Sequence, residues 1–140
     1  MRVRLAAAPV GRLATVTAAL RPHVVPCCFA LVGEVVFSAV DAKPKSTLAL
    51  RRLDNIRANP ATSLLVDHYD DDWTTLWWVR VDGAARVVDD DTTRATALAA
   101  LQQKYVQYRE QPPRGAVIAL AIEAWRGWSY DASRPGRTST

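Results

Sequence analysis

The chain has 140 residues, of which 49% are hydrophobic and 23% are charged, with a formal net charge of +4. These values are typical of one soluble globular domain with a sizeable core. Proline, glycine or charge interrupts every apolar run, and the first twelve residues lack the apolar core of a secretory signal. We therefore expect a cytoplasmic protein without a membrane span.

The first third of the chain predicts three short strands in a meander. Each is rich in β-branched or apolar residues and is bounded by a turn. They run from Arg12 to Ala19, from His23 to Leu31 and from Val35 to Ala39. Pro26 has no N–H to donate to a strand ladder, so it should lie at a sheet edge or a bulge.

The rest of the chain alternates helices with further strands. Apolar residues recur at helical spacing from Thr47 to Ala58 and again from Asp89 to Tyr108. The predicted strands between and after these helices run from Ala61 to Tyr69, from Thr75 to Val88, with a bulge at Gly83, and from Ala116 to Trp128. This order favours a β-rich α+β domain over residues 1–128, a partly closed antiparallel barrel with two main helices, followed by a loose tail over 129–140.

A basic turn precedes the first of these helices. Lys43 and Lys45 come just before Ser46, whose side chain can cap the helix. Unpaired N–H groups at a helix start, with two ammonium groups beside them, suit a phosphate. An ordinary solvated turn explains the same residues equally well, so the local sequence leaves both readings open.

Residues able to perform chemistry without a cofactor are scarce. The two histidines are far apart, no Cys/His/Asp group has metal-ligand spacing, and no serine lies in a nucleophile-elbow context. Cys27 and Cys28 are neighbours on a predicted strand and should point to opposite faces, so we expect neither a disulfide nor a metal site. An enzyme of this kind borrows its chemistry from a cofactor. Tryptophans such as Trp78 can wall a flat heterocycle, although core or interface packing is the default interpretation.

Three long segments resemble one known superfamily. They are LATVTAALRPHVVPCCFAL, VVFSAVDAKPKSTLALRRLDNIRANPATSLLVDHYDDDW and LWWVRVDGAARVV. Together they resemble the split β-barrel flavin/deazaflavin oxidoreductases of the pyridoxamine 5′-phosphate oxidase superfamily, and most of all its actinobacterial branch that uses coenzyme F-420. The resemblance covers roughly residues 12–128 and lies in the order of the pieces rather than in one diagnostic motif.

The resemblance implies a six-stranded split barrel that works as a homodimer, with two cofactor sites at the subunit interface. In it, Lys43, Lys45 and Ser46 match the phosphate-binding turn, and Phe37 and Ser38 match the strand end that flanks the cofactor. Further residues match positions that contact the ring system: Val25, Pro26, Cys27 and Trp78.

Departures from the superfamily pattern argue against vitamin B6 oxidation. Pyridoxamine phosphate oxidases carry Arg and Lys where this chain has Val25 and Ala30, and the chain end WRGWSYDASRPGRTST lacks their Arg-containing substrate motif. The first helix of the family is reduced here to MRVRLAAAPVG.

The leading hypothesis is hydride transfer between the deazaflavin F-420 and a small conjugated organic substrate, with no catalytic residue singled out in the chain. The alternatives are an FMN-dependent oxidase or flavin reductase of the same fold, and a non-catalytic carrier of a flavin or haem-like molecule. Nucleic-acid binding is disfavoured because no aromatic-basic RNA motif occurs.

Overall fold

The computed structural model describes residues 1–40 and 47–131, with backbone alone for residues 47–50. Its helices and strands follow in this order: α1 (Arg2–Ala7), β1 (Gly11–Val16), β2 (Pro22–Cys27), β3 (Ala30–Val32), β4 (Val35–Ala39), α2 (Thr47–Ala58), β5 (Ala61–His68), the 3-10 turn η1 (Trp73–Thr75), β6 (Trp77–Val87), α3 (Asp91–Lys104), α4 (Val106–Glu110) and β7 (Val117–Ser129). The predicted basic turn with Lys43, Lys45 and Ser46 lies outside the described residues.

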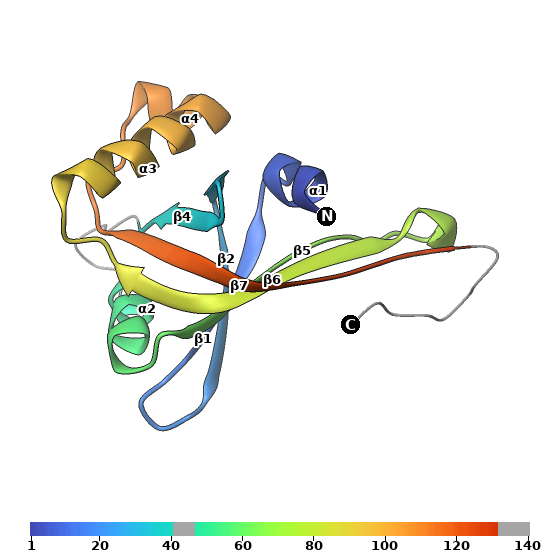
Figure 1. Ribbon diagram of the computed structural model, residues 1–140, viewed down its shortest axis with the longest axis horizontal. Coiled ribbons are helices and arrows are strands. Elements are labelled where there is room, and N and C mark those ends of the chain that lie inside the picture. The colour runs from blue at the N-terminus through green and yellow to red at the C-terminus, as the bar shows by residue number, and fades with distance from the viewer. Residues whose placement is uncertain (41–46, 132–140) are drawn as a thin grey trace.

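The strands form one antiparallel sheet with the order β2-β1-β5-β6-β7-β4-β3 (Figure 1). The described sheet has seven strands, so the predicted count of six was wrong. The predicted run from His23 to Leu31 pairs antiparallel with both predicted neighbours, through β2 with β1 and through β3 with β4, although these two hairpins lie at opposite ends of the strand order. The additional strand arises where the predicted strand from His23 to Leu31 divides into β2 and β3.

A two-residue link, Cys28 and Phe29, joins the two edge strands. Because β2 and β3 are the first and last strands of the order, the sheet must curl until its edges meet at this link. The Tyr105 hydroxyl occupies the backbone groups of Phe29, whose N–H donates to it at 3.0 Å and whose carbonyl oxygen lies 3.0 Å from it. Phe29 therefore cannot continue a strand ladder, and the barrel is split at this point.

Several features predicted from short stretches of sequence lie at the predicted positions in the structure. Helix α2 has the predicted bounds, Thr47 to Ala58. Pro26 lies on the edge strand β2. The register of β6 against β7 shifts between Asp82 and Gly83, as predicted, but the extra residue is Glu123, so the bulge lies on β7 opposite Gly83. A Cβ at Gly83 would collide with the carbonyl oxygen of Ala121 on β7, so the two backbones approach here more closely than a side chain would permit.

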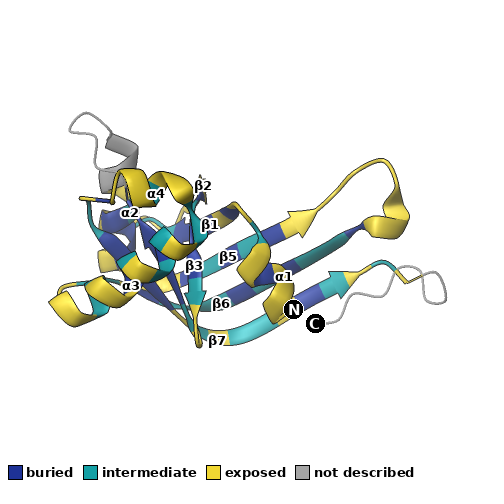
Figure 2. Ribbon diagram, turned by 90° about the horizontal axis from the view of Figure 1, so that it is seen from above, coloured by how far each residue is buried: buried dark blue, intermediate teal, exposed yellow. Residues whose placement is uncertain are grey.

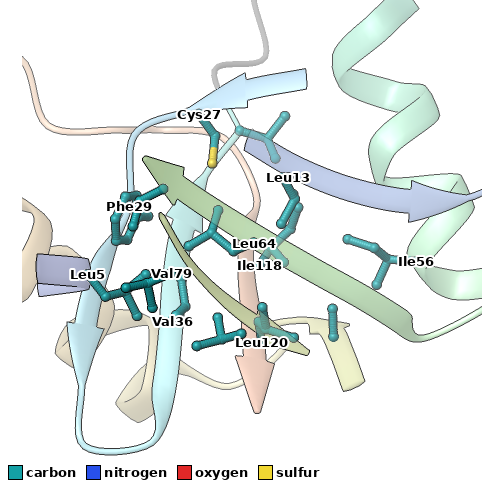
Figure 3. Close-up of a cluster of buried hydrophobic side chains, with 14 of the residues drawn as sticks. Leu5, Leu13, Cys27, Phe29, Val36, Ile56, Leu64, Val79, Ile118 and Leu120 are labelled. Atoms are coloured by element: carbon teal, nitrogen blue, oxygen red, sulfur yellow. The ribbon is translucent and has the colours of Figure 1, made fainter. Parts of the chain in front are cut away.

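The barrel interior holds the main hydrophobic core, to which strands and helices both contribute (Figure 3). Leu5 of α1 has no exposed surface and packs with residues such as Phe29 and Leu64. The short N-terminal helix thus fills part of the barrel. Two cation–π contacts attach it further, since Arg2 lies over Trp125 at 5.1 Å and Arg4 over Trp77 at 5.0 Å.

The second predicted helix is interrupted rather than continuous. Tyr105 separates α3 from α4 and has extended backbone angles, φ −116° and ψ 120°. Its hydroxyl bonds to Phe29 and lies 3.0 Å from the carbonyl oxygen of Pro9. The side chain of Tyr105 therefore hydrogen-bonds to the barrel backbone at the point where the helix is interrupted.

The tip between β5 and β6 projects away from the helices and is exposed (Figures 1 and 2). Asp72 caps η1 there by accepting a hydrogen bond from the Thr74 N–H at 3.1 Å. Among the described residues, no helix combines the length and the hydropathy that a membrane crossing requires.

Candidate cofactor-binding site

The end of β2 and the middle of β4 meet around one buried hydroxyl. Ser38 of β4 is 3% exposed, and its Oγ donates to the carbonyl oxygen of Cys28 at 2.8 Å. Cys27, the last residue of β2, is also buried, and the Ser38 side chain lies close enough to its thiol to act against the rise in the thiol's pKa. The two strands are thus held together beside the split in the barrel, and both residues belong to the set predicted from the sequence.

Two basic side chains from different helices surround this point. Arg52 of α2 and Lys104 of α3 are half-buried, and both are close enough to Cys27 for their charges to act on its thiol. Arg52 Nε and Lys104 Nζ are shielded from solvent, and neither has a hydrogen-bond partner in the part of the chain that the structure describes. None of the ion pairs formed among the described side chains includes either residue. The site therefore carries positive charge that no described carboxylate pairs with.

Burial sets the ionisation of these groups. It raises the pKa of the Cys27 thiol, against the opposing effects of the Ser38 side chain and the charges of Arg52 and Lys104. Desolvation lowers the pKa of Lys104 to about 8, while the nearby thiols of Cys28 and Cys27 act to raise it. At neutral pH the Cys27 thiol is protonated and the ammonium of Lys104 is the prevailing form. The site is cationic.

Aromatic rings form the wall beside Lys104. Its Nζ lies 3.8 Å from the ring centroid of Phe29 and 5.3 Å from that of Tyr105. Tyr105 in turn makes an edge-to-face contact with Tyr108, with ring centroids 5.5 Å apart. The ring faces stabilise the ammonium but accept none of its hydrogen bonds in the ordinary sense.

The predicted ring-contacting residues do not share one surface. Val25 and Cys27 pack on the main core, whereas Pro26 between them is exposed. Phe37 is buried against α3 in a separate cluster with Ala97. Strand alternation thus divides the set between the two faces of the sheet.

Trp78 lies on the outer face of β6, since its neighbour Val79 points into the core. It pairs in register with Trp128 of β7, and the two line a hollow of about 430 Å³ together with Met1 and Arg4 of the N-terminal segment. Its side chain is therefore on the opposite face of the sheet from Cys27. A single ligand in contact with both residues would have to pass around the edge of the barrel.

The sequence analysis did not identify Arg52 and Lys104 as site residues. Arg52 is half-buried, although an arginine on an amphipathic helix is expected on its solvent face. Lys104 did carry a signal, because it lies three residues after buried Leu101 and four before Tyr108, on the apolar face of α3. A lysine at a core-facing position is unusual and could have been noted.

Within the described part of the chain, no cluster of three or more His, Cys, Asp or Glu side chains could hold a metal ion. The free thiols of Cys27 and Cys28 are not joined in a disulfide.

A family comparison agrees with this architecture. The sequence profile described as "Pyridoxamine 5'-phosphate oxidase" matches residues 1–129. The chain belongs to this family. No curated protein sequence matches it significantly.

Several solved structures share the fold at low sequence identity. A conserved hypothetical protein of Mycobacterium tuberculosis is 17% identical with a TM-score of 0.75, over 99% of this chain and 88% of that chain. A heme binding protein of Mycobacterium smegmatis is 20% identical with a TM-score of 0.74, over 99% of this chain but 55% of its own. A FAD-binding protein of Mesorhizobium loti is 23% identical with a TM-score of 0.66, over 90% and 89% of the two chains. At these identities the likeness establishes the fold alone.

Proposed function

We propose that this protein is an oxidoreductase that binds a flavin-type cofactor and transfers a hydride between it and a small conjugated organic molecule. The first choice of cofactor is the deazaflavin F-420. Family membership supports this class of function. The observation that carries the proposal is the buried Arg52 Nε, which has no hydrogen-bond partner among the described residues and lies close to Cys27.

The residues of the site suit an anionic cofactor group. A buried guanidinium N–H without an acceptor is costly, and a phosphate oxygen would satisfy it with a charge-assisted hydrogen bond. Arg52 lies on α2, the helix that follows the predicted phosphate-binding turn with Lys43, Lys45 and Ser46. We propose that this turn and Arg52 hold the same phosphate, in a homodimer whose cofactor sites lie at the subunit interface.

The protein's own contribution is positioning. The cofactor supplies hydride transfer when bound. Ser38 fixes the end of β2 through the carbonyl oxygen of Cys28, so the backbone beside the cofactor keeps its shape. The buried thiol of Cys27 adds no charge at neutral pH, because burial raises its pKa. Rigid placement and exclusion of water are the sources of rate enhancement available to such a site.

A second candidate cofactor is FMN or FAD. Structural relatives from Mesorhizobium loti and Mycobacterium smegmatis are described as FAD-binding proteins, which favours a true flavin in this fold. Other relatives are described as heme binding or storage proteins, from Mycobacterium smegmatis and Vibrio cholerae. The carrier alternative draws its support from these relatives.

The cofactor is tested by titration. Purified protein is mixed separately with F-420, FMN, FAD and haem, and binding is followed by quenching of tryptophan fluorescence. F-420 is expected to bind most tightly, and reduced F-420 should then lose its hydride to a member of a panel of quinones and enones. Tight FMN or FAD binding without F-420 binding would contradict the first choice. Binding without any hydride transfer would favour the carrier.

The role of Arg52 is tested by Arg52→Gln. Loss of a charge-assisted hydrogen bond of about 1.5–3 kcal/mol corresponds to a rise in the dissociation constant of roughly tenfold to a hundredfold. Arg57→Gln is the matched control, because Arg57 is on the same helix, is exposed and pairs only weakly with Asp54 at 3.9 Å. Equal affinity in the two variants would place the phosphate away from Arg52.

A further inference from the structure

Lys104 is a charged residue on the core-facing side of a helix. Ala97 and Leu101 precede it by seven and three residues and have no exposed surface, and Tyr108 follows it by four. The spacing puts Ala97, Leu101 and Lys104 on one face of α3, and Tyr108 of α4 packs on the same cluster as Leu101 after the break at Tyr105. That face packs against β3 and β4, near Ala30 and Ala39. Lysine is rare on the core-facing side of a helix unless its ammonium has a partner.

No such partner exists among the described residues. Nζ of Lys104 is shielded from solvent and makes no hydrogen bond. The titratable groups that face it are Cys27, Cys28 and Tyr105. The two thiols act to raise the pKa of Lys104, but desolvation lowers it by more. Burial also raises the pKa of the Tyr105 hydroxyl to about 12, so the phenol is neutral near pH 7 and offers no counter-charge. The ammonium thus has three N–H donors, and the described groups beside them are the ring faces of Phe29 and Tyr105.

The geometry is better explained by a ligand than by stability. A methionine at this position would fill the same space against Phe29 without burying a charge. An ammonium beside aromatic rings and thiols instead offers hydrogen-bond donors to an acceptor that carries negative charge. The four-carbon stem of lysine is flexible, so Nζ can leave the Phe29 ring to meet such a group.

We propose that Lys104 binds the oxyanion of a small ligand, a carboxylate or a phosphate, at the split between β2 and β3. This position is on α3, whereas the proposed cofactor phosphate belongs to α2 and Arg52. The ligand is the hydride acceptor of the proposed reaction, and this last identification is the one part that rests on the proposed function.

The test uses protein without cofactor, labelled with carbon-13 at the Cε of lysine. The chain has three lysines, Lys43, Lys45 and Lys104, so the NMR spectrum is simple. Lys104→Arg keeps the charge and identifies the Lys104 signal by its loss. The signal of Lys104 should titrate near pH 8, below the ordinary value for lysine. Benzoate and inorganic phosphate are then added separately.

A bound oxyanion favours the charged ammonium, so the midpoint for Lys104 should rise by about one to three pH units with the ligand that binds. A rise with benzoate alone identifies a carboxylate site, and a rise with phosphate alone a phosphate site. Lys104→Met should weaken binding of that probe at least about tenfold by calorimetry. The exposed neighbour Gln103 provides the control, because Gln103→Met should leave the affinity unchanged.

An unchanged midpoint for Lys104 with both probes would overturn the proposal. So would a rise of the same size at all three lysines, because that is a general effect of the added salt. Neither result depends on F-420 or FMN, and a failure of cofactor binding leaves this test intact. Conversely, normal cofactor affinity in Lys104→Met would be consistent with two separate anion positions.

Discussion

Replacing Tyr105 by Phe should destabilise the barrel at its split. The Tyr105 hydroxyl accepts a hydrogen bond from the Phe29 N–H at 3.0 Å, and its single proton is shared between the carbonyl oxygens of Phe29 and Pro9, each 3.0 Å away. Phe29 has no exposed surface, so water cannot replace the lost acceptor in the folded state. The variant keeps the ring and its contacts with Tyr108.

The magnitude follows from these bonds. A buried N–H left without an acceptor costs about 1–3 kcal/mol, and the lost donation from the hydroxyl adds about 1 kcal/mol. The free energy of unfolding should therefore fall by roughly 2–4 kcal/mol. Tyr69→Phe removes the same oxygen from an exposed ring at the hairpin tip and should change it by less than about 0.5 kcal/mol.

Urea denaturation followed by tryptophan fluorescence measures both variants. A second signature comes from alkaline pH, because burial raises the pKa of Tyr105 to about 12 in the folded state from an ordinary value of 10.0. The unfolded chain loses this proton first, so the stabilising contribution is complete below pH 10 and is lost as the pH rises to about 12. In Tyr105→Phe, the free energy of unfolding should not show this loss between pH 10 and about 12. Equal stability of Tyr105→Phe and Tyr69→Phe would refute the role of the hydroxyl in holding the split.

Three further results are expected. Gly83→Ala forces a Cβ into the backbone of β7 and should lower the free energy of unfolding, measured in urea, by about 1–3 kcal/mol. The cost should exceed that of Gly127→Ala, whose Cβ approaches closely only the flexible Met1 side chain at 2.8 Å and meets the Trp78 carbonyl oxygen at an ordinary 3.4 Å. Leu5→Ala should cost about 2–5 kcal/mol because Leu5 is fully buried, whereas Val3→Ala, 80% exposed, should not alter the urea midpoint. Folding lowers the pKa of Lys104 from 10.5 to about 8, so its contribution to stability is complete above pH 10.5 and is lost as the pH falls through 8. Lys104→Met should therefore remove this pH dependence from the urea midpoint measured between pH 7 and 10.

The candidate site was only partly accessible from the sequence. Cys27 and Ser38 were predicted and do meet, because the resemblance supplied their neighbourhood in the fold. Arg52 and Lys104 were missed, since their convergence on Cys27 depends on how two helices pack on opposite sides of one strand end. The predicted roles of Phe37 and Trp78 remain predictions, and the structure places Phe37 beneath α3 and Trp78 on the outer face of β6.

The sequence by itself determined the elements whose signals are local. Helical spacing and flanking residues predict the bounds of α2, and proline chemistry predicts the edge position of Pro26. A glycine within an alternating strand predicts the irregularity between Asp82 and Gly83, but not that its extra residue is on β7. Each of these depends on residues within a few positions of one another. Family membership likewise rests on the order of such segments.

The tertiary structure alone decided the seventh strand and the chemistry of the split. The run from His23 to Leu31 is apolar almost throughout and resembles one strand. The hydroxyl of Tyr105, 76 residues after Phe29, hydrogen-bonds to the backbone of Phe29, where this run is divided into β2 and β3. The same packing of α3 on the barrel puts Lys104 over the Phe29 ring. Periodicity reports which face of an element is apolar, whereas the partner of that face is set by contacts distant in the chain.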